Sequence, residues 1–294
     1  FELNFGCPHG MTERGMGAAV GQDPEIACMV VEWVMEKATI PVITKLTPNV
    51  HSVVPTGRSV VKAGSNGLSL INTIQSVTGV DLDSFVPNPY VGGKSVFGGY
   101  CGPAVKPIAL KMLTTIAQDD LTSKVPISGI GGVSTWKDAV EFMLLGASNV
   151  QVCTAAMHHG FRIVEDMAEG LNNWMNEKGF KKLTDFIGKS VPTVTHWEDL
   201  DINYHHVAQI NQEKCIHCGL CYIACEDTSH QSINLEKGMP YNTYTIKEEE
   251  CVGCNLCQLV CPVDNCITME ERRVAPEYIN WVEWQKRGLP LNDH

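Results

Sequence analysis

The sequence predicts an α/β protein, in which a large unit of repeated strand–helix pairs precedes a small, cysteine-rich α+β module. Short apolar runs alternate with amphipathic stretches over residues 1–180, and this repetition predicts a parallel sheet covered by helices. Eight of the 13 cysteines then gather in two runs between residues 215 and 261. The 294 residues suffice for one large domain and one small one.

The large unit is expected to contain five strands, each followed by a helix. The strands are expected at residues 1–6, 41–46, 67–72, 125–130 and 149–153. The helices are expected near residues 24–38, 51–63, 105–118, 134–146 and 161–178. A closed (β/α)8 barrel needs eight strands, so we interpret this unit as a partial barrel that lacks its N-terminal strands. The chain starts at Phe1, inside an expected strand, which indicates a fragment of a longer protein.

An open, doubly wound sheet is the alternative architecture for this unit. Such a sheet gathers its functional residues at one switch point, where the strand order reverses. A barrel instead presents them after the C-terminal ends of several strands. Polar residues and glycines that could act in catalysis or binding follow several of the expected strands, and this distribution favours the barrel.

The remainder of the chain divides into three parts. Residues 181–208 are polar, contain Pro192 and lack periodicity, so they are expected to form a linker. Residues 209–271 form the cysteine-rich module, and residues 272–294 form a C-terminal tail. The net charge of −11 argues against a nucleic-acid partner, and no apolar run is long enough to cross a membrane. The free cysteines indicate a reducing compartment, expected to be the cytoplasm.

Both cysteine runs have the spacing of bacterial ferredoxins. The runs are Cys215, Cys218, Cys221 and Cys225, then Cys251, Cys254, Cys257 and Cys261, followed by Pro262. In this pattern the first three cysteines bind one [4Fe–4S] cluster and the fourth reaches the other cluster. We therefore assign Cys215, Cys218, Cys221 and Cys261 to one cluster, and Cys251, Cys254, Cys257 and Cys225 to the other. A zinc site or a disulfide framework would favour separate CxxC pairs.

A candidate catalytic cysteine follows the first expected strand. Cys7 lies between Asn4 and a glycine-rich stretch that runs from Gly10 to Gly21. A cysteine at the mouth of a barrel can act as a general acid or base if its pKa and access suit that task. A glycine-rich loop suits a mobile lid. Burial as a small apolar side chain is the alternative role for Cys7.

Further candidates end the other strands. Lys45 would point its ammonium group into the mouth, where it could stabilise a reduced, anionic flavin. Asn72 and Thr73 offer amide and hydroxyl groups to a planar polar ring. The turn 129–132 and the pair Cys153-Thr154 lie where (β/α)8 proteins bind phosphate through backbone N–H groups. A surface lysine, a strand cap and ordinary tight turns are the structural alternatives.

These motifs resemble those of the dihydroorotate/dihydropyrimidine dehydrogenase family of FMN barrels. The motifs are Asn4-Phe5-Gly6-Cys7-Pro8-His9-Gly10, Thr44-Lys45-Leu46-Thr47-Pro48-Asn49, Ile71-Asn72-Thr73, residues 98–107 and Ile130-Gly131-Gly132-Val133. With a two-cluster module in the same chain, the sequence most resembles the NAD-dependent dihydropyrimidine dehydrogenases. Two residues depart from the family pattern, which usually has serine in place of Gly6 and often in place of Cys101.

The resemblance implies roles for particular residues. It implies that Cys7 is the catalytic cysteine, with His9 beside it, and that Asn4, Asn72 and Thr73 bind the pyrimidine. It implies FMN contacts by Lys45, Gly102, Gly131, Gly132, Cys153 and Thr154. The expected activity is the NADH-linked reduction of uracil or thymine to the 5,6-dihydropyrimidine, or the reverse reaction. Electrons are expected to pass through the clusters to FMN, with Cys7 as general acid or base.

NAD(H) is expected to bind elsewhere. No GxGxxG follows a strand, so a separate FAD-containing, NAD-binding partner subunit is expected, which the resemblance also implies. The protein is therefore expected to be a hetero-oligomer. A dihydroorotate dehydrogenase is one alternative, although that family usually places its cluster on another subunit. A non-catalytic iron–sulfur electron-transfer subunit is the other, and bound FMN would distinguish it.

Overall fold

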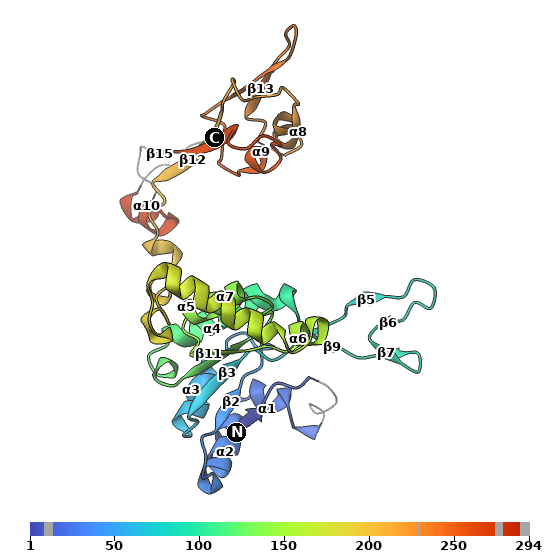
Figure 1. The fold of residues 1–294 in the computed structure, drawn as a ribbon, viewed down its shortest axis with the longest axis vertical. Helices are drawn as coiled ribbons and strands as arrows, with labels where there is room; N and C mark the ends of the chain where they lie inside the picture. The colour runs from blue at the N-terminus through green and yellow to red at the C-terminus, as the bar shows by residue number, and fades with distance from the viewer. Residues whose placement is uncertain (9–13, 229, 274–278, 289–294) are drawn as a thin grey trace. The chain divides into compact units, whose positions relative to one another are not determined.

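The computed structural model describes residues 1–8, 14–228, 230–273 and 279–288. The chain forms two compact units, Phe1–Val194 and Thr195–His294, which Figure 1 shows as ribbons coloured along the sequence. No helix in the described ranges is both long enough and apolar enough to span a membrane.

The first unit contains a five-stranded parallel sheet. Its strands are β1 (Glu2–Asn4), β2 (Ile43–Lys45), β3 (Gly67–Leu70), β10 (Ile127–Ile130) and β11 (Asn149–Gln151). Each strand pairs with the next in chain order, so the described sheet has no reversal of the kind that creates a switch point. The predicted α/β class and parallel sheet are confirmed.

Helices connect these strands. The five expected helices are α2 (Pro24–Lys37), α3 (Val54–Lys62), α4 (Lys106–Gln118), α5 (Trp136–Leu144) and α7 (Ile163–Lys178). Short elements without a sequence prediction are α1 (Ala18–Gln22), α6 (Thr154–His159), η2 (Pro103–Val105) and η3 (Thr122–Lys124). The start of α2 is fixed locally, because the Asp23 carboxylate accepts hydrogen bonds from the backbone N–H groups of Glu25 and Ile26.

The parallel sheet is strongly curved. Its edge strands, β1 and β11, are four strand spacings apart, which amounts to about 19 Å in a flat sheet. Nevertheless, Nε2 of Gln151 in β11 donates a hydrogen bond to Oε2 of Glu2 in β1, at 2.9 Å. Two extended side chains do not cover the flat-sheet separation, so the sheet coils and brings its two edges toward each other.

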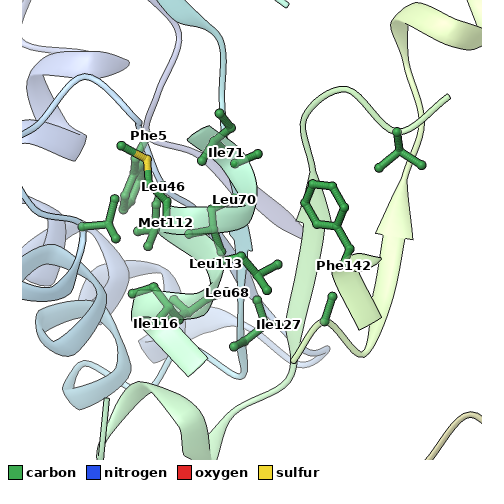
Figure 2. Close-up of a cluster of buried hydrophobic side chains, with 14 of the residues drawn as sticks. Phe5, Leu46, Leu68, Leu70, Ile71, Met112, Leu113, Ile116, Ile127 and Phe142 are labelled. Carbon is green, nitrogen blue, oxygen red and sulfur yellow. The ribbon is translucent and has the colours of Figure 1, made fainter. Parts of the chain in front are cut away.

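The core of the first unit lies between the sheet and the helices behind it. All four residues of β3 are buried, as expected for a central parallel strand covered on both faces. Figure 2 shows Leu68 and Leu70 of this strand among side chains from neighbouring strands and helices. Burying one leucine stabilises the fold by about 1.5–3 kcal/mol. Gly129 lets Phe142 pack directly on β10, since an added Cβ would lie 2.5 Å from the Phe142 ring.

An arm of short antiparallel strands extends from the first unit (Figure 1). Its strands are β4 (Ile74–Ser76), β5 (Gly79–Val80), β6 (Pro87–Asn88), β7 (Tyr90–Val91), β8 (Lys94–Ser95) and β9 (Gly98–Tyr100). β4 pairs with β9, β5 with β6, and β7 with β8. The arm exposes large apolar side chains, including those of Leu82, Phe85 and Val91. Strands of two or three residues leave no periodic pattern, so the sequence did not predict them.

The first part of the expected linker, residues 181–194, belongs to the first unit. Three 3-10 turns follow α7: η4 (Leu183–Asp185), η5 (Val191–Thr193) and η6 (Trp197–Asp199). Phe186 is fully buried, with its ring centroid 5.0 Å from that of Trp174 and 5.4 Å from that of Phe180. This cluster packs Phe186 and Ile187 against the first unit, which extends to Val194.

The second unit repeats one arrangement twice. Its elements are β12 (Tyr204–Ile210), α8 (Leu220–Glu226), β13 (Ile233–Glu236), β14 (Thr243–Ile246), α9 (Leu256–Leu259), β15 (Ile267–Arg273) and α10 (Trp281–Arg287). β12, α8 and β13 form one half, and β14, α9 and β15 form the other. The antiparallel pairs, β12 with β15 and β13 with β14, each join one strand from each half. β12 starts at Tyr204, so the last residues of the expected linker belong to this unit.

Candidate functional site

A cavity of about 180 Å³ lies at the C-terminal ends of the parallel strands. The structure brings together around it most of the site residues predicted for this unit. Those that line it are Lys45, Asn72, Thr73, Gly102, Gly131, Gly132, Cys153 and Thr154. They come from the ends of β2, β3, β10 and β11 and from the turn before η2. The cavity therefore lies where barrel enzymes place their chemistry.

Three predicted residues stand apart from this lining. Of the described residues, Asn4 and Cys7 are not among those that line the cavity. Asn4 ends β1, and its Oδ1 accepts a 2.8 Å hydrogen bond from Nδ2 of Asn72, which does line it. Cys7 is half-buried, and its carbonyl oxygen accepts a hydrogen bond from the Ala18 N–H at 3.0 Å. His9 lies outside the described residues.

Asn49 organises the polar end of the cavity and was not among the predicted site residues. Its Nδ2 donates to the carbonyl oxygen of Thr73 at 3.0 Å, and its Oδ1 accepts from the Gln75 N–H at 2.8 Å. Asn72 is fixed in turn, because its Oδ1 accepts from the Thr73 N–H at 2.9 Å. The signal was present in the sequence, since Asn49 ends the motif that begins at Thr44.

Gly6 leaves space for Asn72. A Cβ at position 6 would lie 2.5 Å from the Cβ of Asn72 and 2.6 Å from its Nδ2. Such distances are well inside van der Waals contact, so any larger residue at this position requires Asn72 to move. The departure of Gly6 from the family's serine is thus coupled to the position of a predicted substrate-binding residue.

Three glycines expose bare backbone at the other end of the cavity. Gly102, Gly131 and Gly132 have φ values of 90°, 136° and 82°, which residues with a side chain rarely adopt. A Cβ on Gly132 would lie 2.8 Å from the carbonyl oxygen of Gly102. The two turns therefore approach each other closely and present peptide groups without side chains. Such a cradle fits the phosphate end of FMN.

An ion pair behind this cradle fixes the turn before α5. Nζ of Lys106 lies 2.6 Å from Oδ1 of Asp138, and Oδ2 of Asp138 accepts from the N–H groups of Ser134 and Thr135. Burial raises the pKa of Asp138, but the hydrogen bonds from Lys106 and the two backbone groups lower it by a larger amount, so its pKa is lowered overall. The carboxylate thus stays ionised and tethers the turn.

Lys45 forms a polar network with two residues that were not predicted. Its Nζ lies 3.1 Å from Oε1 of Glu2 and 3.3 Å from Oε1 of Gln151. Both partners are polar residues within short strands of the expected sheet, which was the available sequence signal. Cys101 was noted only as a departure from the family; it lines the cavity and its Sγ accepts a hydrogen bond from Oγ1 of Thr154 at 3.2 Å.

The second unit contains two small cavities lined by the predicted cluster ligands. Cys215, Cys218, Cys221 and Cys261 line one of them. Cys225, Cys251, Cys254 and Cys257 line the other. Each cavity therefore takes three cysteines from one run and the fourth from the other run. This is the crossed grouping that the spacing predicts for two [4Fe–4S] clusters.

The thiols fit clusters chemically as well. Burial, with a smaller contribution from neighbouring cysteines, raises the pKa of Cys221 to about 11 and that of Cys257 to about 11. Several cysteines in one cavity become thiolates together only when metal cations compensate their charge. Backbone N–H groups already point at the sulfurs, from His217 to Cys215 at 3.4 Å and from Ser232 to Cys225 at 3.2 Å.

One difference between the two cluster cavities lies five residues after the fourth cysteine of each run. Cys266 lies five residues after Cys261 and lines the first cavity, whereas His230 lies five residues after Cys225 and lines the second. Cys266 is buried and packs in the core of the second unit. Position 266 lies beside the cluster ligands because the structural repeat includes it. The cysteine spacing ends at Cys261 and gives no indication of this.

Comparisons with known proteins agree with both units. Residues 1–175 match the dihydroorotate dehydrogenase family, and residues 208–269 match the 4Fe–4S dicluster domain. The subunit PreA of the NAD-dependent dihydropyrimidine dehydrogenase of Escherichia coli K12 is 42% identical over 232 residues, which are 79% of this chain and 56% of that protein.

Two further relatives are similar over shorter parts of the chain. The chloroplastic dihydropyrimidine dehydrogenase (NADP+) of Arabidopsis thaliana is 44% identical over 68% of this chain and 47% of its own length. The catalytic subunit of dihydroorotate dehydrogenase B (NAD+) of Pyrococcus furiosus is 44% identical over 64% of this chain and 59% of its own length. The chain spans about half the length of these relatives. It is a member of the dihydroorotate dehydrogenase family, with a 4Fe–4S dicluster domain after the family's catalytic unit.

Proposed function

We propose that this chain belongs to an NAD-dependent dihydropyrimidine dehydrogenase, which reduces uracil or thymine to the 5,6-dihydropyrimidine or runs in reverse. The observation that carries the proposal is the presence, in one chain, of a glycine-lined cavity at the strand ends and two cysteine-lined cluster sites. The similarity to the E. coli dihydropyrimidine dehydrogenase subunit covers 232 residues, which exceeds the 194 residues of the first unit and so extends into the second.

The strand order and the curvature support a (β/α)8 barrel, of which this chain supplies five strands. The contact between Glu2 and Gln151 brings the edges of the sheet together, as barrel closure requires. The cavity of about 180 Å³ is smaller than the roughly 300–1,000 Å³ of complete small-molecule sites. In this proposal, a segment equivalent to the part of the relatives that the chain does not span supplies the remaining strands and the remaining wall of the cavity.

The polar end of the cavity is assigned to the pyrimidine. Asn4, Asn72 and Thr73 bind the amide edges of the ring, because amide and hydroxyl groups match its alternating donors and acceptors. Cys7 holds the proton that is exchanged with C5 of the ring, and His9 lies beside it in the sequence. The bond between Asn4 and Asn72 links the two elements that bind the ring.

The opposite end of the cavity is assigned to FMN. Gly102, Gly131, Gly132, Cys153 and Thr154, which line the cavity, would hold the phosphate end, and Lys45 would contact the ring system. Bound FMN would supply hydride chemistry, and the clusters would supply single electrons. The chain's own residues then have three tasks: they orient the pyrimidine, hold its proton and keep the flavin in contact with it.

The clusters connect this site to a partner. The crossed cysteine groups place two one-electron carriers in a single small unit, beside the flavin domain in sequence. A separate FAD-containing, NAD-binding subunit is the proposed electron donor, since the E. coli relative is itself named as one subunit of its enzyme. The proposed location is the cytoplasm, where reducing conditions preserve the thiolates.

A dihydroorotate dehydrogenase is the competing function. Its support is the P. furiosus relative, whose similarity covers 190 residues and is therefore no longer than the first unit. The dicluster domain at residues 208–269 favours the dihydropyrimidine reaction, because the relative that shares more of the chain carries that name.

The test uses the full-length protein, purified without oxygen together with its partner subunit. NADH oxidation is measured with uracil, with thymine and with orotate. Reduced viologen serves as a second electron donor that bypasses the partner. We expect uracil-dependent turnover, and we expect Cys7→Ala to lower it by about 10²–10⁴-fold, the usual contribution of a general acid. The matched control is Cys28→Ala, because Cys28 is half-buried like Cys7 but lies on α2, where its Sγ faces Oε1 of Glu32 in the same helix.

Each alternative has its own result. Turnover of orotate with no turnover of uracil would identify a dihydroorotate dehydrogenase. A protein with both clusters and without FMN would be a non-catalytic electron carrier. Equal loss in Cys7→Ala and Cys28→Ala would remove the catalytic role of Cys7.

A further inference from the structure

Three side chains form a closed polar ring beside the cavity. Nζ of Lys45 donates to Oε1 of Glu2 at 3.1 Å and to Oε1 of Gln151 at 3.3 Å. Nε2 of Gln151 donates to the other oxygen of Glu2, at 2.9 Å. Each pair of residues is therefore joined directly. The three come from β1, β2 and β11, so the ring exists only because the sheet is curved.

The ring has an inner and an outer member with respect to the cavity. Lys45 and Gln151 line the cavity, whereas Glu2 does not. The side chain of Lys45 is 16% exposed and that of Glu2 is 31% exposed. Screening by water is therefore weaker than for an ion pair on the open surface, and the charges act on each other and on a neighbouring ligand more strongly.

The carboxyl group of Glu2 is ionised at neutral pH. Burial raises its pKa, but the hydrogen bond from Gln151 and the charge of Lys45 lower it by more, so the pKa is lowered overall. A full negative charge therefore lies within 3.1 Å of the ammonium group that is assigned to the flavin. Gln151 has no charge and fixes the geometry of both.

We propose that Glu2 is a positioning residue whose negative charge opposes Lys45 and thereby lowers the reduction potential of the flavin in this cavity. The inference rests on the proposed function, because it requires FMN to bind beside Lys45. Reduced flavin gains negative charge, which an ammonium group stabilises and a nearby carboxylate destabilises. The strength of Lys45 as an electrophilic partner is thus set by a residue that does not line the cavity.

The test is the midpoint potential of FMN in the full-length protein. Glu2→Gln keeps the size of the side chain and removes its charge, so the flavin should become easier to reduce. We expect at least a tenfold change in the equilibrium between oxidised and two-electron-reduced flavin, which corresponds to about +30 mV. The clusters, followed by electron paramagnetic resonance in the same titration, should keep their potentials.

A second variant tests the same charge in the opposite direction. Gln151→Glu adds a negative charge beside Lys45 and should lower the flavin potential. The double variant Glu2→Gln/Gln151→Glu moves the charge by one position and should return the potential toward that of the parent. The control is Glu177→Gln, on the exposed face of α7, which should leave the potential unchanged.

The sign of the shift separates this role from a purely structural one. If Glu2 only supported Lys45, Glu2→Gln would resemble Lys45→Met and lower the potential. A lowered or unchanged potential in Glu2→Gln, or an unchanged potential in Gln151→Glu, overturns the inference. A parent protein that binds no FMN would instead contradict the proposed function, so the two failures are distinguishable.

Discussion

Nδ2 of Asn72 donates a hydrogen bond to Oδ1 of Asn4 across 2.8 Å, and so links the end of β3 to the end of β1. The strand β2 lies between these two strands in the sheet. Asn4 also accepts from the Gly6 N–H at 3.1 Å, one residue before Cys7. The two predicted pyrimidine-binding asparagines are therefore hydrogen-bonded to each other. Asn4 is also hydrogen-bonded to the residue before the predicted catalytic cysteine.

Gly6→Ala should displace Asn72 without disturbing the flavin. The new methyl group would lie 2.5 Å from the Cβ of Asn72, so the amide must leave its hydrogen bond with Asn4. We expect KM for uracil to rise at least tenfold, with FMN content unchanged. Gly79→Ala is the control, because nothing lies within 4 Å of its added Cβ. An unchanged KM in Gly6→Ala would mean that Asn72 does not bind substrate.

Gly132→Ala should remove FMN. Its φ of 82° costs a residue with a side chain about 1–2 kcal/mol, and its Cβ would also lie 2.8 Å from the Gly102 carbonyl oxygen. The measurement is the ratio of flavin to protein after gel filtration. Gly188→Ala has a similar φ of 77° with free space around the Cβ, and should retain FMN. Loss of FMN from both variants would point to strain alone and not to the cradle.

Asp138→Asn should change how stability depends on pH. The pKa of Asp138 is lowered in the folded protein, so its stabilising effect is complete above the unfolded value of about 4 and disappears as pH falls through the folded value. We expect the variant to lose about 1–3 kcal/mol at pH 7 and to show a flatter acid limb in thermal unfolding. Parallel acid limbs in parent and variant would exclude Asp138 as the source.

Serine variants of the ligands test the crossed cluster assignment. Cys261→Ser should leave the same residual spectrum as Cys221→Ser, since both line the first cavity. Cys225→Ser should match Cys257→Ser, since both line the second. Electron paramagnetic resonance of the reduced proteins measures this. Matching spectra for Cys261→Ser and Cys257→Ser would show that each run binds its own cluster. Cys266→Ser should retain both clusters.

Features with a strict local pattern were predictable from the sequence. The cysteine spacing alone grouped Cys261 with Cys215, and the structure places both in one cavity. The strands and main helices of the first unit followed from apolar periodicity, and their observed ends differ from the expected ones by a few residues. The parallel sheet followed from the same alternation.

Features that depend on curvature were not predictable in this way. Glu2 and Gln151 are 149 residues apart in the chain, and no local pattern indicates that they touch. Phe186 lies in a polar stretch, and its burial depends on Trp174 in the preceding helix. The role of Gly6 depends on a long-range contact, because no local pattern indicates how close Asn72 lies to it.

The base of the arm forms part of the cavity wall. The arm leaves the first unit at Thr73 and returns at Tyr100, and both of these residues line the cavity. Within the arm, β4 and β9 pair directly at its base, with Ile74 opposite Tyr100. A contact that immobilised the apolar tip would therefore stiffen two walls of the cavity at once, and a contact that twisted the tip would turn them together.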